Sequence, residues 1–166
     1  MYNFNMNYLI IDIETTGLSA KQHSIVEIGA LLTDENYNII DIFETYVYAP
    51  YVPPFITNFN GIKASHLVNA PKIDQALRDL VKFAQEAVPI AHNSRFDQGF
   101  IRHYLEITNT PYIKTEWIDT IPLFKSKFPG MKNYKLDTLI KHFNLAAKED
   151  HRALSDAKHT LTLLKI

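Results

Sequence analysis

The sequence contains no cysteine among its 166 residues. This absence excludes disulfide bonds, thiolate nucleophiles and zinc sites built on cysteine, and it is compatible with a reducing compartment. The sequence also lacks an excess of positive charge, because 17 basic and 18 acidic residues give a formal net charge of -1. The charge balance therefore gives no indication of nucleic-acid binding. It does not exclude an enzyme acting on nucleic acid, since acids that bind divalent cations lower the formal charge.

Long apolar runs are absent too. No run approaches the ~18 residues needed to span a bilayer, and the start MYNFNMNYLII lacks the basic region and long apolar core of a leader segment. We therefore expect a soluble, cytoplasmic protein with no membrane partner. With 46% hydrophobic residues the chain can bury a core of its own. The simplest organisation is a single domain over residues 1–166.

Residues 8–17, YLIIDIETTG, predict a short strand buried on both faces in the middle of a sheet. Asp12 and Glu14 interrupt its apolar run, and because strand side chains alternate, they project from one face about 7 Å apart. Burying two like charges together costs several kcal/mol unless their pKa values rise or a cation lies between them. The residues TTG end the strand, and sites in open α/β sheets gather at such carboxyl ends. The alternative is a strand-end aspartate with a turn-capping glutamate.

The rest of the chain predicts an α/β fold with an antiparallel start. Glu27, inside an apolar strand, is interpreted as a structural carboxylate. Residues 50–71 are expected to form a loop with short helices. The expected strands are 24–33, 39–48, 88–92 and the short extended piece 117–120, and the expected helices are 73–87, one within 92–105, 121–128, 136–143 and 153–164.

Two further stretches carry polar side chains that could reach a common site. Asp97 shares the helical stripe of Phe100 and Ile101, so it points toward the core. Alternatively, Ser94 caps this helix and Asp97 only stabilises its first turn. His92 and Asn93, between a strand and a helix, could fix a loop or contact a ligand.

Near the carboxyl end, Asp156 borders the apolar stripe of the last helix. His151 lies about 140° away from it on a helix, so both reach one site only if His151 belongs to the preceding loop. A loop histidine and a solvent-facing aspartate are the alternative. The basic stretch with Lys132 and Lys135 is interpreted as a solvated surface.

These motifs together resemble the DEDDh family of 3′–5′ exonucleases. DIETTG at 12–17 is similar to the first motif of the family, HN at 92–93 with FD at 96–97 to the second, and His151 with Asp156 to the third. The similarity covers nearly the whole chain, including FNGI at 59–62 and IDT at 118–120. It is greatest to the proofreading domains of bacterial DNA polymerase III, of the epsilon-subunit or PolC type.

The resemblance implies a ribonuclease H-like fold, with a mixed five-stranded β-sheet flanked by α-helices. It also implies two divalent cations, Mg²⁺ or Mn²⁺, held by Asp12, Glu14, Asp97 and Asp156. His151 would act as the general base. The residues implied to bind the terminal nucleotide are Thr15, Thr16, Gly17, Leu18, Asn60, His92, Asn93 and Phe96.

The implied substrate is single-stranded DNA or a frayed 3′ end, with release of nucleoside 5′-monophosphates. RNA is an alternative substrate, because recognition of the 2′-hydroxyl depends on the shape of the pocket. Two other classes stay open: a non-catalytic module that binds nucleic acid or a polymerase, and an unrelated metal-binding structural domain. A DNA polymerase is an expected partner, and the sequence does not indicate an oligomeric state.

Overall fold

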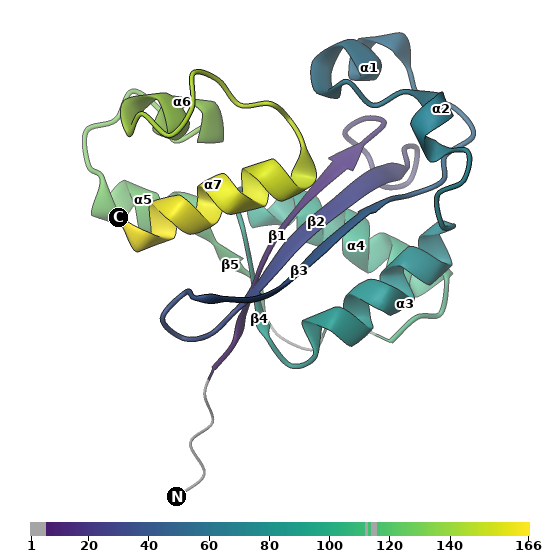
Figure 1. Ribbon diagram of the computed structural model, residues 1–166, viewed down its shortest axis with the longest axis horizontal. Coiled ribbons are helices and arrows are strands. Elements are labelled where there is room, and N and C mark those ends of the chain that lie inside the picture. Colours follow the sequence, from purple (N-terminus) through teal and green to yellow (C-terminus); the bar gives the residue numbers. More distant parts are fainter. Residues whose placement is uncertain (1–5, 112, 114–115) are drawn as a thin grey trace, which may run out of the picture.

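The structure, a computed structural model, describes residues 6–111, 113 and 116–166. Residues 1–5, on which the expectation of no leader segment partly rests, lie outside this part. Five strands form one sheet in the order β3-β2-β1-β4-β5 (Figure 1). Their bounds are β1 Tyr8–Thr15, β2 Ile25–Thr33, β3 Ile39–Tyr46, β4 Val88–Ala91 and β5 Ile118–Asp119.

β1 is the central strand, as its apolar run predicts. It pairs antiparallel with β2 and parallel with β4, while β2 pairs antiparallel with β3 and β4 pairs parallel with β5. The sheet is therefore mixed and five-stranded, and the predicted antiparallel start is confirmed. β4 pairs with β1 only as far as Ile10, so the last residues of β1 extend beyond their parallel neighbour.

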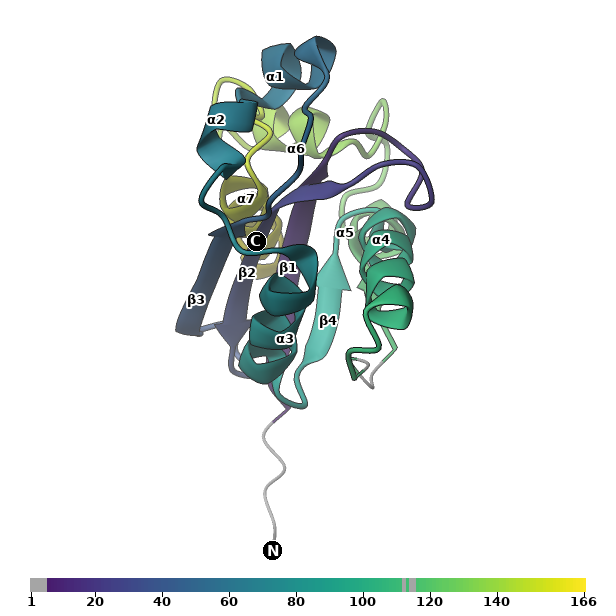
Figure 2. The same ribbon diagram turned by 90° about the vertical axis from the view of Figure 1, so that its right-hand side faces the viewer.

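Helices cover both faces of the sheet (Figures 1 and 2). α3 (Ile73–Ala84) and α4 (Ser94–Ile107) pack on the face that carries Leu9, Ile11 and Ile13 of β1. α7 (Ala153–Lys165) packs on the opposite face, where Ile10 joins Leu161 in a second core cluster. Because strand side chains alternate, the even-numbered residues of β1 project toward α7.

Gly29 of β2 allows α7 to lie close to the sheet. A Cβ atom at this position would collide with the backbone of Ala153 and Leu154, in the first turn of α7. Gly29 is also the cross-strand partner of Asp12. The missing side chain therefore seats the start of α7 directly beside the acidic end of β1.

Of the four shorter helices, α1, α2 and α6 lie at the end of the molecule where β1 ends (Figures 1 and 2). The bounds of these four helices are α1 Pro54–Asn60, α2 Ala64–Leu67, α5 Thr120–Lys127 and α6 Leu136–His142.

Within the described residues, no helix is long and apolar enough to cross a membrane.

Most other bounds differ from the sequence predictions by one residue, and three differences have a local structural cause. α3 ends at Ala84 rather than residue 87, because Gln85 adopts a positive φ of 51° that stops the helix. β3 ends at Tyr46 rather than residue 48, since the amide of Tyr48 donates to the carbonyl of Pro71 instead of a strand. Ser94 is not the N-cap of α4; Asn93 holds that position, with a φ of 61° and no side-chain cap.

Candidate active site

Four carboxylates and one histidine from separate parts of the chain line a single cavity of about 250 Å³ at the carboxyl end of β1. Two come from β1, one from α4, one from α7 and one from the loop that precedes α7. They are Asp12, Glu14, Asp97, Asp156 and His151. The structure thus brings together all five residues that the sequence motifs single out.

Asp97 reaches the site because β4 stops short of the end of β1. Its Oδ1 accepts a hydrogen bond of 3.1 Å from the backbone amide of Ile13, between the two acidic residues of β1. Asp97 is only 2% exposed, which confirms that its side chain points inward. This hydrogen bond therefore joins the carboxylate of α4 directly to β1, the strand that carries Asp12 and Glu14.

Asp156 occupies the first turn of α7 and is also 2% exposed, so the solvent-facing alternative is wrong. One carboxylate oxygen each of Asp12, Glu14 and Asp156 lie within 4.8 Å of one another. The buried Oδ1 of Asp156 has no hydrogen-bond partner. An orphaned, buried carboxylate oxygen among other carboxylates is the environment in which a protein holds a hard divalent cation.

Burial and mutual repulsion raise the pKa of every one of these acids. Burial is the larger cause for Asp12, whose pKa lies well above its usual value, and the charges of Asp97, Asp156 and Glu14 add to it. Burial raises the pKa of Glu14 to about 8, against a lowering by its bond from Asn60. Burial likewise raises the pKa of Asp97 to about 8 and, with the charge of Glu149, that of Asp156 to about 9. Without a cation, this site favours bound protons.

The oxygen-rich donor set fits Mg²⁺ or Mn²⁺, which prefer carboxylate ligands. In the described part of the chain, no ion pair joins a basic side chain to Asp12, Glu14, Asp97 or Asp156. Among the described residues, the nearby charge of Arg152 opposes the burial that raises the pKa of Glu14, but none of the four carboxylates has an ion-pair partner. The residues present match the cations that the sequence motifs imply.

His151 lies in the loop before α7, as its spacing from Asp156 requires. It adopts a positive φ of 53°. Its ring stacks on Phe59 of α1, with centroids 3.8 Å apart and planes inclined by 23°. Its Nδ1 lies 3.2 Å from Oε1 of Glu149. The two contacts hold the imidazole at the mouth of the acidic cavity.

Sequence reasoning missed Glu149. It lies in a polar run typical of a solvated loop, yet its side chain is only 17% exposed and lines the cavity. Its ligand atoms, with those of His151 and Asp156, form a second group that could hold a metal ion. No local periodicity marks this residue. Only its position two residues before His151 distinguishes it.

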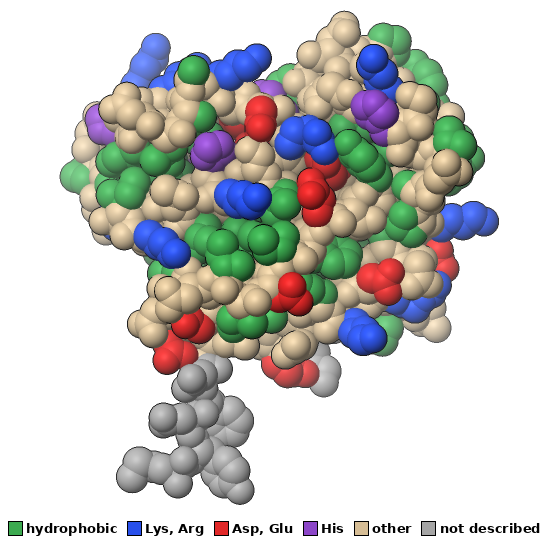
Figure 3. Space-filling view, in the orientation of Figure 1, with side chains coloured by type: hydrophobic (Ala, Val, Ile, Leu, Met, Phe, Trp, Pro, Cys, Tyr) green, Lys and Arg blue, Asp and Glu red, His purple; other side chains and the backbone are tan. Residues whose placement is uncertain are grey.

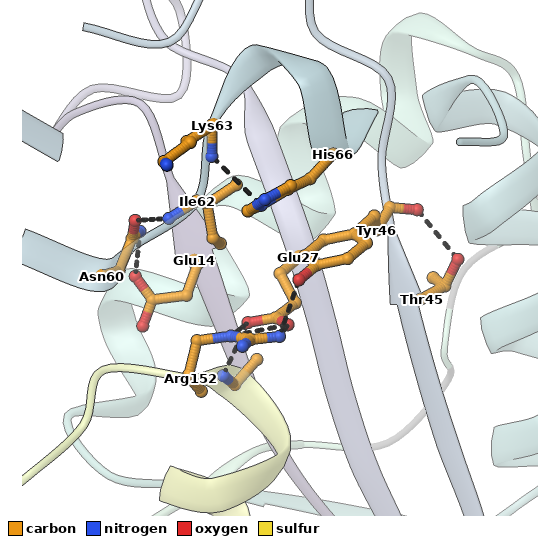
Figure 4. Close-up of polar contacts among 10 residues, drawn as sticks. Glu14, Glu27, Thr45, Tyr46, Asn60, Ile62, Lys63, His66 and Arg152 are labelled. Atoms are coloured by element: carbon orange, nitrogen blue, oxygen red, sulfur yellow. Dashed lines mark hydrogen bonds and ion pairs between the residues drawn. The ribbon is translucent and has the colours of Figure 1, made fainter. Parts of the chain in front are cut away.

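Glu27 has the structural role predicted for it. Its carboxylate is 1% exposed and accepts two hydrogen bonds, of 3.0 and 3.1 Å, from Nε of Arg152 (Figure 4). The carboxylate also accepts a hydrogen bond of 2.9 Å from the backbone amide of Ala153. Arg152 in turn donates a hydrogen bond of 2.9 Å to the hydroxyl of Tyr46. This network ties the start of α7 to β2 and β3. Asn60, only 4% exposed, similarly donates to Oε2 of Glu14 at 2.9 Å.

The residues implied to bind a nucleotide do not all reach the cavity. Thr15, Gly17, Leu18, His92, Asn93 and Phe96 line it, whereas Thr16 and Asn60 do not. Leu18 is 87% exposed at the rim. Thr16 accepts the amide of Ser24 at 2.9 Å, so its hydroxyl stabilises the turn after β1.

His92 is held on both sides of its ring. Nε2 lies 2.8 Å from the carbonyl of Tyr134, and Nδ1 lies 2.8 Å from the hydroxyl of Thr120. Because a carbonyl only accepts, Nε2 donates and Nδ1 accepts from the threonine. Burial lowers the pKa of His92, which favours this neutral form. Neither ring nitrogen is therefore free for a substrate.

Comparison with solved structures gives the same fold. Exonuclease X, in complex with 5′ overhanging duplex DNA, is 26% identical with a TM-score of 0.72, over 95% of this chain and 89% of that one. E. coli Exonuclease I, in complex with a dT13 oligonucleotide, is 16% identical with a TM-score of 0.83, over 96% of this chain and 40% of that one.

Comparison of sequences identifies the family. The chain is 40% identical over 155 residues to DNA polymerase III PolC-type of Caldanaerobacter subterraneus, and 36% identical over 165 residues to that of Clostridium perfringens. The matches cover 92% and 98% of this chain but only 11% of each polymerase. The family model described as exonuclease (RNase_T) matches residues 9–164. Together with the motifs of the site, this match shows that the chain belongs to the exonuclease family.

Proposed function

We propose that this protein is a metal-dependent 3′–5′ exonuclease that hydrolyses the terminal phosphodiester bond of single-stranded DNA and releases nucleoside 5′-monophosphates. The observation that carries the proposal is the convergence of Asp12, Glu14, Asp97, His151 and Asp156 on one cavity. DNA is favoured as substrate because the relatives are DNA polymerases and the similar structures hold DNA. As these relatives are polymerases, the same likeness supports a DNA polymerase as the partner or the parent chain.

Asp12, Glu14 and Asp156 would hold one divalent cation, and Asp97 with Asp12 would hold a second. Such ions neutralise the charge that grows on the phosphate and make a water molecule acidic near neutral pH. Among the described residues the four carboxylates form no ion pair, and two of them are fixed through Asn60 and the amide of Ile13. The acids are therefore positioned before the cations and the substrate arrive.

His151 would accept the proton of the attacking water. Nδ1 of His151 lies 3.2 Å from Oε1 of Glu149, and because a carboxylate only accepts hydrogen bonds, this approach would favour the tautomer with the ring proton on Nδ1. Nε2 is then the nitrogen with a free lone pair. Glu149 would thus fix both the tautomer and, with Phe59, the orientation of the base.

The cavity also offers an apolar side to the terminal nucleotide. Ile56, Phe59 and Phe96 line it together with the acids, and Leu18, 87% exposed, lies at its rim. Contacts of apolar and aromatic side chains with a base do not depend on its identity. An exonuclease that removes any terminal nucleotide needs a pocket of this kind.

A direct test follows linear single-stranded DNA labelled at its 5′ end in the presence of Mn²⁺. We expect stepwise shortening from the 3′ end and nucleoside 5′-monophosphates as products, with no reaction in EDTA. A circular strand of the same sequence is the matched control and should stay intact. Activity in EDTA, or cleavage of the circle, would contradict the proposal. Faster shortening of the RNA analogue would assign the same site to RNA.

A further inference from the structure

A second and larger cavity, of about 760 Å³, adjoins the candidate active site. Four residues line both cavities, namely Asp12, His92, Asn93 and Glu149. The rest of the larger cavity is formed by α5 and by the segment that leads into α6. The two cavities therefore meet at Asp12, one of the acids proposed to hold the cations, and at Glu149.

The larger cavity is lined by three lysines, in a chain whose formal net charge is -1. Lys125, Lys132 and Lys135 are all exposed, and none of them forms an ion pair within the described residues. In the space-filling view, basic side chains gather over α6, and acidic side chains are visible between α6 and the α1–α2 part (Figure 3). The sequence interpretation of this stretch as merely solvated does not account for its place beside the site.

The segment that carries two of the lysines is fixed by hydrogen bonds. Oδ1 of Asn133 accepts from the amide of Lys135 at 3.0 Å and from the hydroxyl of Thr138 at 2.8 Å. The carbonyl of Tyr134 accepts from His92 at 2.8 Å, and Nζ of Lys125 lies 6.0 Å from the centre of the Tyr134 ring. His92 therefore connects the segment that carries Lys132 and Lys135 to the end of β4, next to the candidate active site.

We propose that the larger cavity binds the nucleotides on the 5′ side of the scissile bond, with Lys125, Lys132 and Lys135 contacting their phosphates. The inference rests on the proposed function. If the terminal base contacts the apolar residues of the smaller cavity and the scissile phosphate lies at the cations held by the acids, the rest of the strand must leave on the other side of the acids. The larger cavity is the exit that the described residues form there.

The charges of the two cavities complement each other in this arrangement. A phosphate backbone approaching four carboxylates meets repulsion, which bound cations relieve only at the reacting phosphate. Lysines along the departing strand offset this repulsion and contribute binding that does not depend on sequence. An exonuclease that shortens a strand repeatedly needs such contacts at every step.

The test compares a dinucleotide with an octanucleotide of thymidine, each labelled at its 5′ end. The variant Lys132→Ala/Lys135→Ala removes two of the proposed contacts. Lys82→Ala/Lys158→Ala is the matched control, because it removes two exposed lysines that line neither of the two cavities. Both kcat/KM in Mn²⁺ and equilibrium binding in EDTA, by fluorescence anisotropy, are measured across a series of salt concentrations.

We expect the preference for the octanucleotide over the dinucleotide to fall about tenfold in Lys132→Ala/Lys135→Ala, and the salt slope of binding to drop by about 1.4 for two phosphates of a single strand. The control variant should retain both. Lys132→Arg/Lys135→Arg, which keeps the charges, should also retain them and shows that the loop still folds. An unchanged length preference and salt slope in the alanine variant would overturn the inference, as would equal losses in the control. Absence of cleavage by the unmodified protein would instead contradict the proposed function, while binding in EDTA still tests the lysines.

Discussion

Glu14 of β1 and Glu27 of β2 are cross-strand partners, but their carboxylates have different hydrogen-bond and charge partners. Glu27 is bound by the guanidinium of Arg152 and by the amide of Ala153. Glu14 accepts a hydrogen bond from the neutral amide of Asn60 and forms no ion pair within the described residues, and its pKa rises to about 8 because it is buried. The structural carboxylate is paired with a guanidinium inside the protein, whereas the neighbouring carboxylates form no ion pair among the described residues, which supports the cation sites proposed above.

The largest expected effect is that of Asp12→Asn, which keeps the shape of the side chain and removes its charge. The rate should fall by more than about 10³, since cations contribute several kcal/mol to such reactions. In EDTA the same variant should melt at a higher temperature, because one of several repelling charges is gone. Single-turnover rates and thermal melts measure the two effects. A rate equal to that of the unmodified protein would contradict the proposed role of Asp12 in holding the cations.

The next effect isolates His151 from the carboxylates. His151→Ala should slow single turnover by about 10² to 10⁴, the range of general base catalysis. The rise in melting temperature that Mn²⁺ produces should persist, because the four carboxylates remain. If the variant instead lost this rise at an unchanged rate, His151 would be a metal ligand and not the base.

Glu27→Gln tests the paired side of the comparison. We expect the free energy of unfolding to fall by about 2 to 4 kcal/mol, because Arg152 loses a buried charge partner. Glu35→Gln, at an exposed position of the turn between β2 and β3, is the control and should change stability by less than about 0.5 kcal/mol. Urea denaturation in EDTA measures both. A loss as small as that of the control would mean that the buried pair contributes nothing to the fold.

The pH dependence of the metal-free protein sharpens the same contrast. Glu14 and Asp97, with pKa values of about 8, and Asp156, at about 9, bind protons that the unfolded chain has already released. Stability should therefore fall as the pH rises from about 5 to 9, on the order of a few kcal/mol. Melting temperatures in EDTA across this range provide the measurement. Saturating Mn²⁺ should flatten the profile, and a metal-free profile that rises with pH would contradict the raised pKa values.

The smallest effect concerns Glu149, which acts through His151. Glu149→Leu should lower the rate by about tenfold, the scale of lost ligand orientation. Glu149→Gln keeps an oxygen that can accept from Nδ1 and should restore most of the rate. A purely structural role would lower the melting temperature of both variants without this difference in rate, so melts accompany the kinetics.

Local patterns predicted the parts of the site that periodicity encodes. Alternation along β1 placed Asp12 and Glu14 on one face, and the stripe of α4 turned Asp97 inward. The contacts that complete the site join distant segments, such as Asn60 with Glu14, Phe59 with His151, and Arg152 with Glu27. The periodicity of the sequence does not predict such contacts, because they depend on where α1 and α7 pack against the sheet. Glu149 was missed for this reason.

Gly29 has a consequence for folding as well as for packing. The sheet between β1 and β2 closes through contacts that are near in sequence, whereas the seating of α7 over Gly29 joins the two ends of the chain. Contacts of high sequence separation carry a loop-closure cost that delays their formation, and cooperative units at the ends of a chain open at a lower free energy than the central strands. We therefore expect the acidic site to assemble last and to disassemble by local opening of α7 while the sheet persists. Hydrogen exchange of the α7 amides should register this opening, and Mn²⁺ should suppress it; exchange as slow as that of the β1 amides would show that helix and sheet open together.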